Sequence, residues 1–140
     1  MSELEALARA LASDETIDIV TTGAKTGRRR TTEIWFRNLA GRIIICGTPS
    51  ANGGAGPRSR RDWLANLIAH PEFEFCLKES VCKCLPARAT VIRDVADRRA
   101  IMSAPQTAWY RNQGFSLDDL VTGSPIVEVR FIGGYAALNR

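Results

Sequence analysis

The hydrophobic pattern of the chain begins with a helix. Between residues 3 and 12, apolar side chains recur at the i, i+3, i+4 and i+7 spacing of one helical face, at Leu4, Leu7, Ala8 and Leu11. Ser2 stands directly before them as a candidate N-cap. We therefore predict a short amphipathic helix within residues 1–14.

Strand patterns follow this helix. Alternating β-branched residues predict strands at 16–22 and 31–37, and the unbroken apolar run Ile43–Cys46 predicts a strand at 42–47 that is covered on both faces. Gly23 and Gly27 indicate a tight reversal between the first two strands, and residues 38–41 indicate a second turn. These segments predict a three-stranded meander whose first hairpin carries a basic tip.

The second half mixes helices with further strands. Residues 48–57 are rich in glycine and proline, which predicts a flexible loop. Ser59 is a candidate N-cap for a helix that ends near His70, with an apolar stripe at Trp63, Leu64, Leu67 and Ile68. Strands are expected within 72–78, 82–93 and 126–131, and helical or irregular segments at 95–102, 109–114 and 116–120. This order is typical of one mainly β (α+β) domain over residues 1–140, an antiparallel split β-barrel with helices at its ends.

Composition narrows the class of protein. The 140 residues are 45% hydrophobic and 24% charged, and no apolar stretch is long enough to cross a bilayer. The N-terminus lacks the pattern of a secretory signal, so we expect a soluble, cytoplasmic protein without an integral membrane segment. For such a protein the four cysteines are expected to stay reduced, and Cys82 and Cys84 to be small, partly buried residues. His70 is the only histidine, which excludes a histidine-rich metal site and a Ser-His-Asp triad.

Positive charge is concentrated in two short runs. The net charge is +4, and of 19 cationic residues four fall in Lys25–Arg30 and three in 58–61. Glycine turns expose backbone N–H groups beside Lys25, Thr26 and Arg30, which together favour a phosphate or a carboxylate. The alternative is a solvated hairpin tip whose charges protect a sheet edge. Arg60 and Arg61, at a predicted helix N-terminus, form the second anion site. Nucleic acid is disfavoured because the hairpin tip lacks aromatic residues for base stacking.

Three motifs carry a resemblance to a known family. They are T-T-G-x-K-[S/T]-G-x-x-R at Thr21–Arg30, a small-residue turn at Gly47-Thr48-Pro49, and W-x-x-N-L at Trp63–Leu67. In their order and spacing the chain resembles the deazaflavin-dependent (coenzyme F-420-dependent) nitroreductases of the flavin and deazaflavin oxidoreductase superfamily. The resemblance implies a split barrel of the pyridoxamine phosphate oxidase-like, FMN-binding type.

The resemblance also implies roles for particular residues. Lys25, Thr26 and Arg30 should hold the phosphate and acidic tail of coenzyme F-420, with help from Arg60 or Arg61. The backbone of Gly47, Thr48 and Pro49 and the side of Trp63 should line its ring, and Tyr110 should donate a hydrogen bond or proton to the substrate. For Trp63 and Tyr110 the alternative is ordinary packing in the core.

The expected activity is hydride transfer from the reduced coenzyme to an electron-poor acceptor, such as a quinone, a nitro compound or an enone. Three departures from the family pattern, at Ala24, at Glu33-Ile34 and in the missing lysine of the third-strand loop, keep FMN as the alternative cofactor. A non-catalytic carrier of a cofactor or lipid-like ligand is a further alternative. The runs Ile43–Cys46 and Ile126–Phe131 each offer a seam for a homodimer.

Overall fold

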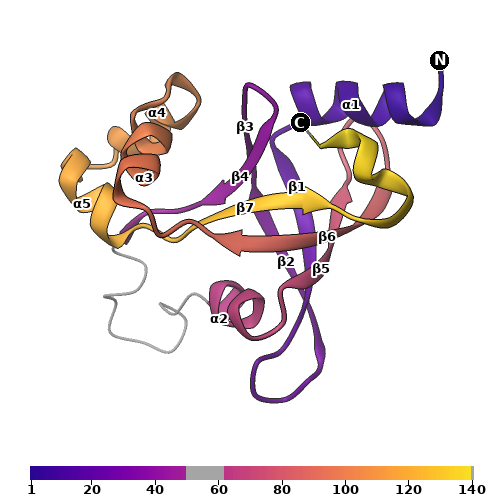
Figure 1. Cartoon of the computed structure of the whole chain (residues 1–140), viewed down its shortest axis with the longest axis horizontal. Coiled ribbons are helices and arrows are strands. Elements are labelled where there is room, and N and C mark those ends of the chain that lie inside the picture. The colour runs from indigo at the N-terminus through magenta and orange to yellow at the C-terminus, as the bar shows by residue number, and fades with distance from the viewer. Residues whose placement is uncertain (50–61, 140) are drawn as a thin grey trace.

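The computed structural model describes residues 1–49 and 62–139. Within these residues one curled antiparallel sheet is closed by helices at its ends and along one flank (Figure 1). The strands are β1 (Thr16–Thr22), β2 (Arg29–Trp35), β3 (Arg37–Leu39), β4 (Arg42–Cys46), β5 (Glu72–Leu77), β6 (Lys83–Val91) and β7 (Ile126–Phe131). The helices are α1 (Glu3–Ser13), α2 (Asp62–Ala69), α3 (Val95–Ser103), α4 (Ala108–Arg111) and α5 (Leu117–Gly123), with 3₁₀ turns at Pro105–Thr107 and Gly133–Leu138.

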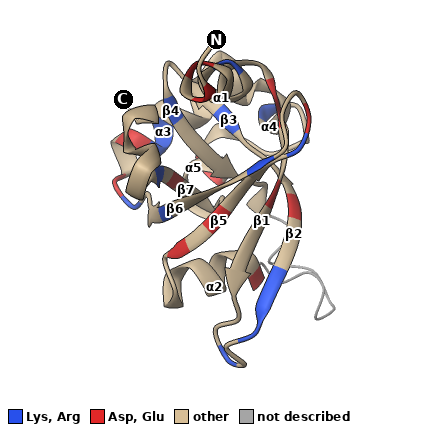
Figure 2. Cartoon of the chain, turned by 90° about the vertical axis from the view of Figure 1, so that its right-hand side faces the viewer, with Lys and Arg blue, Asp and Glu red and all other residues tan. Residues whose placement is uncertain are grey.

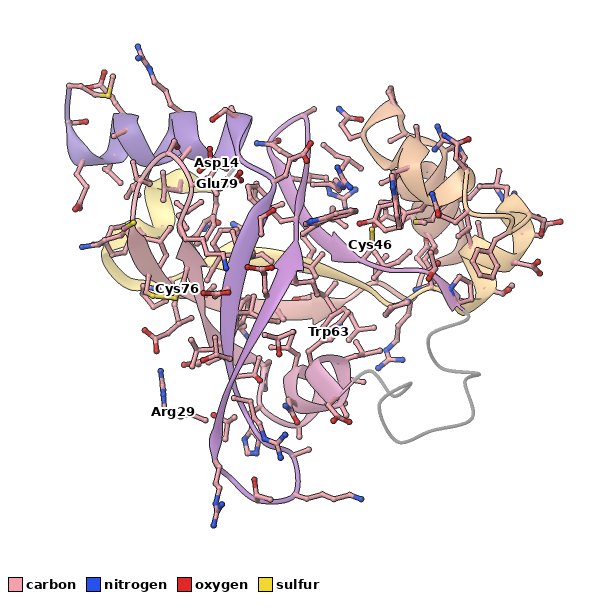
Figure 3. All side chains as sticks on the ribbon, turned by 180° about the vertical axis from the view of Figure 1, so that it is seen from behind. Asp14, Arg29, Cys46, Trp63, Cys76 and Glu79 are labelled. Carbon is pink, nitrogen blue, oxygen red and sulfur yellow. A yellow bond between two sulfur atoms is a disulfide. The ribbon has the colours of Figure 1, made fainter. Side chains whose placement is uncertain are left out.

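Helix α1 confirms the N-terminal prediction and shows why it starts where it does. The Ser2 hydroxyl accepts the Glu5 N–H at 3.1 Å, and the Glu5 carboxylate accepts the Ser2 N–H at 3.2 Å, which completes a capping box. At the far end of α1, two carboxylates join the start of β1 to the turn between β5 and β6 (Figure 3). Glu79 accepts the N–H groups of residues 15 and 16, and Asp14 accepts the N–H and hydroxyl of Ser80.

The order of the strands is β2-β1-β5-β6-β7-β4-β3. The predicted three-stranded meander is therefore wrong, because β2 pairs with β1 while β3 pairs with β4. The chain bends at Phe36, a fully buried aromatic, and so passes directly from one edge of the sheet to the other. The second turn is also shorter than predicted, since residues 37–39 form β3 and only Ala40 and Gly41 reverse the chain, both at positive φ. The curled antiparallel sheet with helices at its ends is the split barrel that the sequence indicated.

Two apolar cores lie on opposite faces of β4. Ile43 and Ile45 point into the main core, which also contains α1, α2 and the inner faces of β1 and β5. Ile44 and Cys46 point to a second core under α3, α4 and α5. Both faces of β4 are thus covered, as its unbroken apolar run predicted. The helical insert is held on the sheet directly beside the last residues of β4.

Several smaller expectations need correction. Ile68 is 54% exposed and lies outside the buried stripe of α2, while the predicted cap at Ser59 lies outside the described residues. Reduced thiols were expected, but Cys76 and Cys84 form a disulfide. The register of β5 and β6 places these two residues directly opposite each other. Cys82 and Cys84 are both exposed rather than partly buried. None of the helices in residues 1–49 and 62–139 has the length and apolar character needed to cross a bilayer.

Candidate functional site

The loop between β1 and β2 has a fixed shape that depends on its two glycines. The Gly23 N–H donates to the Arg28 carbonyl at 2.7 Å, and the Gly27 N–H donates to the Gly23 carbonyl at 2.9 Å. Gly27 has a φ of 71°, and a Cβ on Gly23 would lie 2.7 Å from the Thr26 hydroxyl oxygen. That oxygen accepts the Arg28 N–H at 3.2 Å, so the hydroxyl proton of Thr26 remains available to a ligand.

Asn66 of α2 fastens this loop to the body of the protein. Its side-chain oxygen accepts the Ala24 N–H at 2.9 Å, and its amide donates to the Thr21 hydroxyl at 3.2 Å. Asn66 is only 7% exposed, and its bond to Thr21 is buried while its bond to Ala24 is partly buried. Asn66 is part of the motif W-x-x-N-L but was not among the predicted site residues. Its position one turn after Trp63, as a polar residue on the buried face of an amphipathic helix, could have indicated a structural or binding role.

The loop and α2 together border an open cavity of about 620 Å³, which we call the tail cavity. It is lined by Gly23, Ala24, Lys25, Thr26, Arg30, Asp62, Leu64, Ala65, Asn66 and Ile68. Three of the sequence-predicted residues, Lys25, Thr26 and Arg30, therefore lie together. Figure 2 shows the same concentration of positive charge at the end of the β1–β2 hairpin.

The two neighbouring arginines at the start of β2 face opposite ways. Arg29 forms an ion pair with Glu74 on the outer face of the sheet (Figure 3). Arg30 stands opposite Thr21 in the ladder, on the inner side that borders the tail cavity. In the part of the chain that the structure describes, Lys25 and Arg30 enter no ion pair. Their charge is thus available to an anion in the tail cavity.

A second cavity, which we call the aromatic cavity, lies farther along β2. Its volume is about 350 Å³, and it is lined by Glu33, Ile34, Trp35, Cys46, Gly47, Thr48, Trp109 and Tyr110. The rings of Trp35 and Trp109 meet edge to face with centroids 5.1 Å apart, and Trp109 meets Tyr110 in the same way at 5.1 Å. Arg30 and Ile34 lie on the same face of β2, about 13 Å apart along an extended strand. One strand therefore borders a basic cavity at one end and an aromatic cavity at the other.

Tyr110 is the buried hydroxyl of the aromatic cavity. Its side chain is 3% exposed and belongs to the second core. Burial is the main cause that raises the pKa of Tyr110 above its ordinary value, and the neighbouring Cys46 thiol adds to this. The Arg37 guanidinium acts in the opposite direction and lowers the pKa. The phenol accordingly stays protonated at neutral pH and can act as a donor.

The remaining predicted residues fall in different places. Gly47 and Thr48 line the aromatic cavity, whereas Pro49 lies against α5, where a Cβ on Gly123 would come within 2.9 Å of it. Trp63 is buried in the main core at 8% exposure, which is the packing alternative for this residue (Figure 3). Arg60 and Arg61 lie outside the described residues.

Comparisons with known proteins agree with this fold. A family model described as F420H(2)-dependent quinone reductase matches residues 3–118. Among the solved structures that are similar, a conserved hypothetical protein from Mycobacterium tuberculosis has a TM-score of 0.61 and 18% identity, over 95% of this chain and 82% of that chain. No curated protein matches the sequence.

Two further solved structures show how widely the fold is shared. A putative pyridoxamine 5'-phosphate oxidase from Listeria innocua has a TM-score of 0.62 and 7% identity, over 94% of this chain and 95% of that chain. A structure described as an F420-H2 dependent reductase has a TM-score of 0.52 and 19% identity, over 84% of this chain and 95% of that chain. At such low identities these likenesses establish the split-barrel fold alone.

Proposed function

The chain belongs to the F420H(2)-dependent quinone reductase family, and from that premise we propose that reduced coenzyme F-420, with its tail in the tail cavity and its ring in the aromatic cavity, reduces a quinone that lies against this ring. The enzyme class and the cofactor follow from the family. The choice of a quinone as acceptor, and the roles of individual residues, are the content of the proposal. The observation that carries it is the pair of cavities, one basic and one aromatic, along the single strand β2.

The two cavities suit the two chemically different parts of the coenzyme. Coenzyme F-420 has a flat deazaflavin ring and an anionic tail, and both cavities have volumes in the range of small-molecule sites. The tail cavity offers an ammonium group, a guanidinium group and a hydroxyl, from Lys25, Arg30 and Thr26. Such donors bind phosphate and carboxylate by charge-assisted hydrogen bonds. When it is bound, the reduced coenzyme supplies the hydride.

The protein's own residues bind and orient the reactants. Lys25, Thr26 and Arg30 hold the acidic tail, and Asn66 keeps their loop in position. Trp35 and Trp109 offer partly exposed aromatic surfaces that suit the flat ring of a quinone. The protonated hydroxyl of Tyr110 donates to the acceptor oxygen on which negative charge develops.

Cofactor titration with neighbouring arginine variants tests the proposal. Arg30→Met removes a cation that faces the tail cavity, whereas Arg29→Met removes one that faces the opposite side and is the matched control. A charge-assisted hydrogen bond contributes roughly 1.5–3 kcal/mol, so Arg30→Met should weaken coenzyme F-420 binding by about 10- to 100-fold. Lys25→Met should have a similar effect, and Arg29→Met should bind like the wild type. Fluorescence of the coenzyme reports each affinity.

The same preparations then test turnover. The wild-type enzyme should oxidise the reduced coenzyme when a soluble naphthoquinone is added, with the Arg30→Met defect concentrated in KM for the coenzyme. Tight coenzyme binding without turnover of any quinone, nitro compound or enone would support the carrier alternative. Stronger binding of FMN than of coenzyme F-420, or equal losses from Arg29→Met and Arg30→Met, would refute the proposed site.

A further inference from the structure

A nearly buried cation stands behind the wall of the aromatic cavity. Arg37 begins β3, directly after the bend at Phe36, and its side chain is only 13% exposed. Its guanidinium carbon lies 5.2 Å from the centroid of the Trp35 ring and 5.4 Å from that of Tyr110. Both rings also line the aromatic cavity. Arg37 itself does not line that cavity, so any effect on an acceptor passes through these two side chains.

The charge of Arg37 is incompletely compensated. Its Nε is buried and has no hydrogen-bond partner in the described part of the chain. The nearest carboxylate is that of Glu15, 3.7 Å from Nη1, and the Glu15 side chain is 66% exposed to water. The two aromatic faces supply part of the missing stabilisation as cation–π contacts. A cation that is largely removed from water acts more strongly on its neighbours than an exposed one does.

The neighbour that can use this field is the Tyr110 hydroxyl. The charged or titratable groups around it are Arg37 from β3, Cys46 from β4 and Glu33, which lines the same cavity from β2. Cys46 and burial both favour the neutral phenol, while Arg37 favours loss of its proton. Arg37 is therefore the group among them that strengthens Tyr110 as a proton donor.

We propose that Arg37 is a positioning residue for quinone reduction, which fixes the Tyr110 ring and strengthens its hydroxyl as the proton donor to the acceptor. The inference rests on the proposed function. Hydride transfer to one carbonyl oxygen of the quinone forms an O–H bond there, breaks both carbonyl π-bonds as the ring becomes aromatic, and leaves a negative charge on the other oxygen. The O–H bond of Tyr110 then breaks and a new O–H bond forms on that second oxygen. The phenolate, stabilised by Arg37, regains a proton from water.

A double-mutant cycle separates this role from simple packing. Tyr110→Phe should lower kcat for a soluble naphthoquinone by about 100-fold, the low end for a general acid. Arg37→Met should lower kcat by about tenfold in the wild-type background and by less than about twofold in the Tyr110→Phe background, because its target is gone. The loss of coenzyme F-420 affinity caused by Arg30→Met should be the same with and without Arg37, since Arg37 does not line the tail cavity.

Arg37→Lys keeps the positive charge and provides a second variant in case Arg37→Met does not fold. It should recover most of the activity lost in Arg37→Met, with a smaller solvent isotope effect on kcat than Arg37→Met shows. An equal loss from Arg37→Met with and without the Tyr110 hydroxyl, or no advantage of Arg37→Lys over Arg37→Met, would overturn the inference and leave the proposed function standing. If Tyr110→Phe alone leaves kcat unchanged, the role proposed for Tyr110 and the inference both fail, whereas the cofactor titrations stay valid.

Discussion

Gly23 is the residue on which the shape of the basic loop depends most directly. A Cβ at this position would come within 2.7 Å of the Thr26 hydroxyl oxygen and 3.2 Å of the Arg28 carbonyl oxygen. Gly23→Ala should therefore rotate Thr26 away from its bond with the Arg28 N–H and weaken coenzyme F-420 binding by about tenfold, the equivalent of one hydrogen bond. Gly134→Ala, where an added Cβ meets nothing within 4 Å, is the control. Unchanged affinity in Gly23→Ala would show that the loop adapts freely.

The Asn66 side chain contributes both to coenzyme binding and to the stability of the fold. Asn66→Ala leaves the Thr21 hydroxyl, itself only 2% exposed, without its donor and frees the Ala24 end of the loop. We expect a loss of about 1–3 kcal/mol in the free energy of unfolding together with weaker coenzyme binding. Ile68→Ala, which trims the same cavity at an exposed side chain, should change stability little. A stability loss with full coenzyme affinity would mean that the loop keeps its position without Asn66.

At the scale of elements, the disulfide joins β5 to β6. Cys76 and Cys84 are directly opposite in the ladder and eight residues apart in sequence. Closing so short a loop stabilises a fold by roughly 2–3 kcal/mol, so Cys84→Ser should lower the melting temperature measurably. Cys82→Ser, two residues away and outside the disulfide, should not. Alkylation of the denatured, unreduced protein should label two cysteines, and labelling of all four would disprove the bond.

Helix α3 is tied to the sheet by a charge pair whose strength depends on pH. Arg42 of β4 donates two hydrogen bonds of 2.9 Å to Asp97, which lowers the Asp97 pKa below its ordinary value of 3.8. Because the Asp97 pKa is lower in the folded than in the unfolded protein, the pair stabilises the fold fully at pH values above the ordinary pKa. This stabilisation is lost as the pH falls through the pKa of the folded protein. Asp97→Asn should cost about 1 kcal/mol at neutral pH, because the pair is partly exposed, and less in acid.

Denaturant titrations of the wild type and Asp97→Asn at neutral pH and below 3.8 measure this difference. An Arg42→Met background is the control. With no guanidinium to pair with, Asp97→Asn should there change stability equally at both pH values. A gap between wild type and Asp97→Asn that is constant with pH would contradict the assigned cause of the lowered pKa.

For the molecule as a whole, the sequence predicted what depends on neighbours along the chain. Helix α1, strands β1, β4 and β7, and the basic loop were recovered because periodicity, capping and glycine spacing are local. The sequence did not predict that β2 and β3 lie at opposite edges of the sheet. The bend at Phe36 that separates them has no sequence signature that distinguishes it from a buried strand residue. The aromatic cavity was recovered only in part, since it assembles residues 33–35, 46–48 and 109–110 from three distant segments. The disulfide depends on register, which composition cannot supply.

A ligand that occupies both cavities should stabilise the whole fold, because these cavities draw on parts far apart in sequence. The tail cavity uses the β1–β2 loop and α2, and the aromatic cavity uses β4 and α4 as well as β2. Binding to the native state alone adds about 2.7 kcal/mol at a free ligand concentration of about 100 times Kd. Coenzyme F-420 should therefore raise the melting temperature more than its deazaflavin ring without the phosphate and acidic tail does. In Arg30→Met, the extra rise in melting temperature given by the complete coenzyme should shrink, while the rise given by the ring alone should persist. An equal reduction of both rises would mean that the tail binds elsewhere.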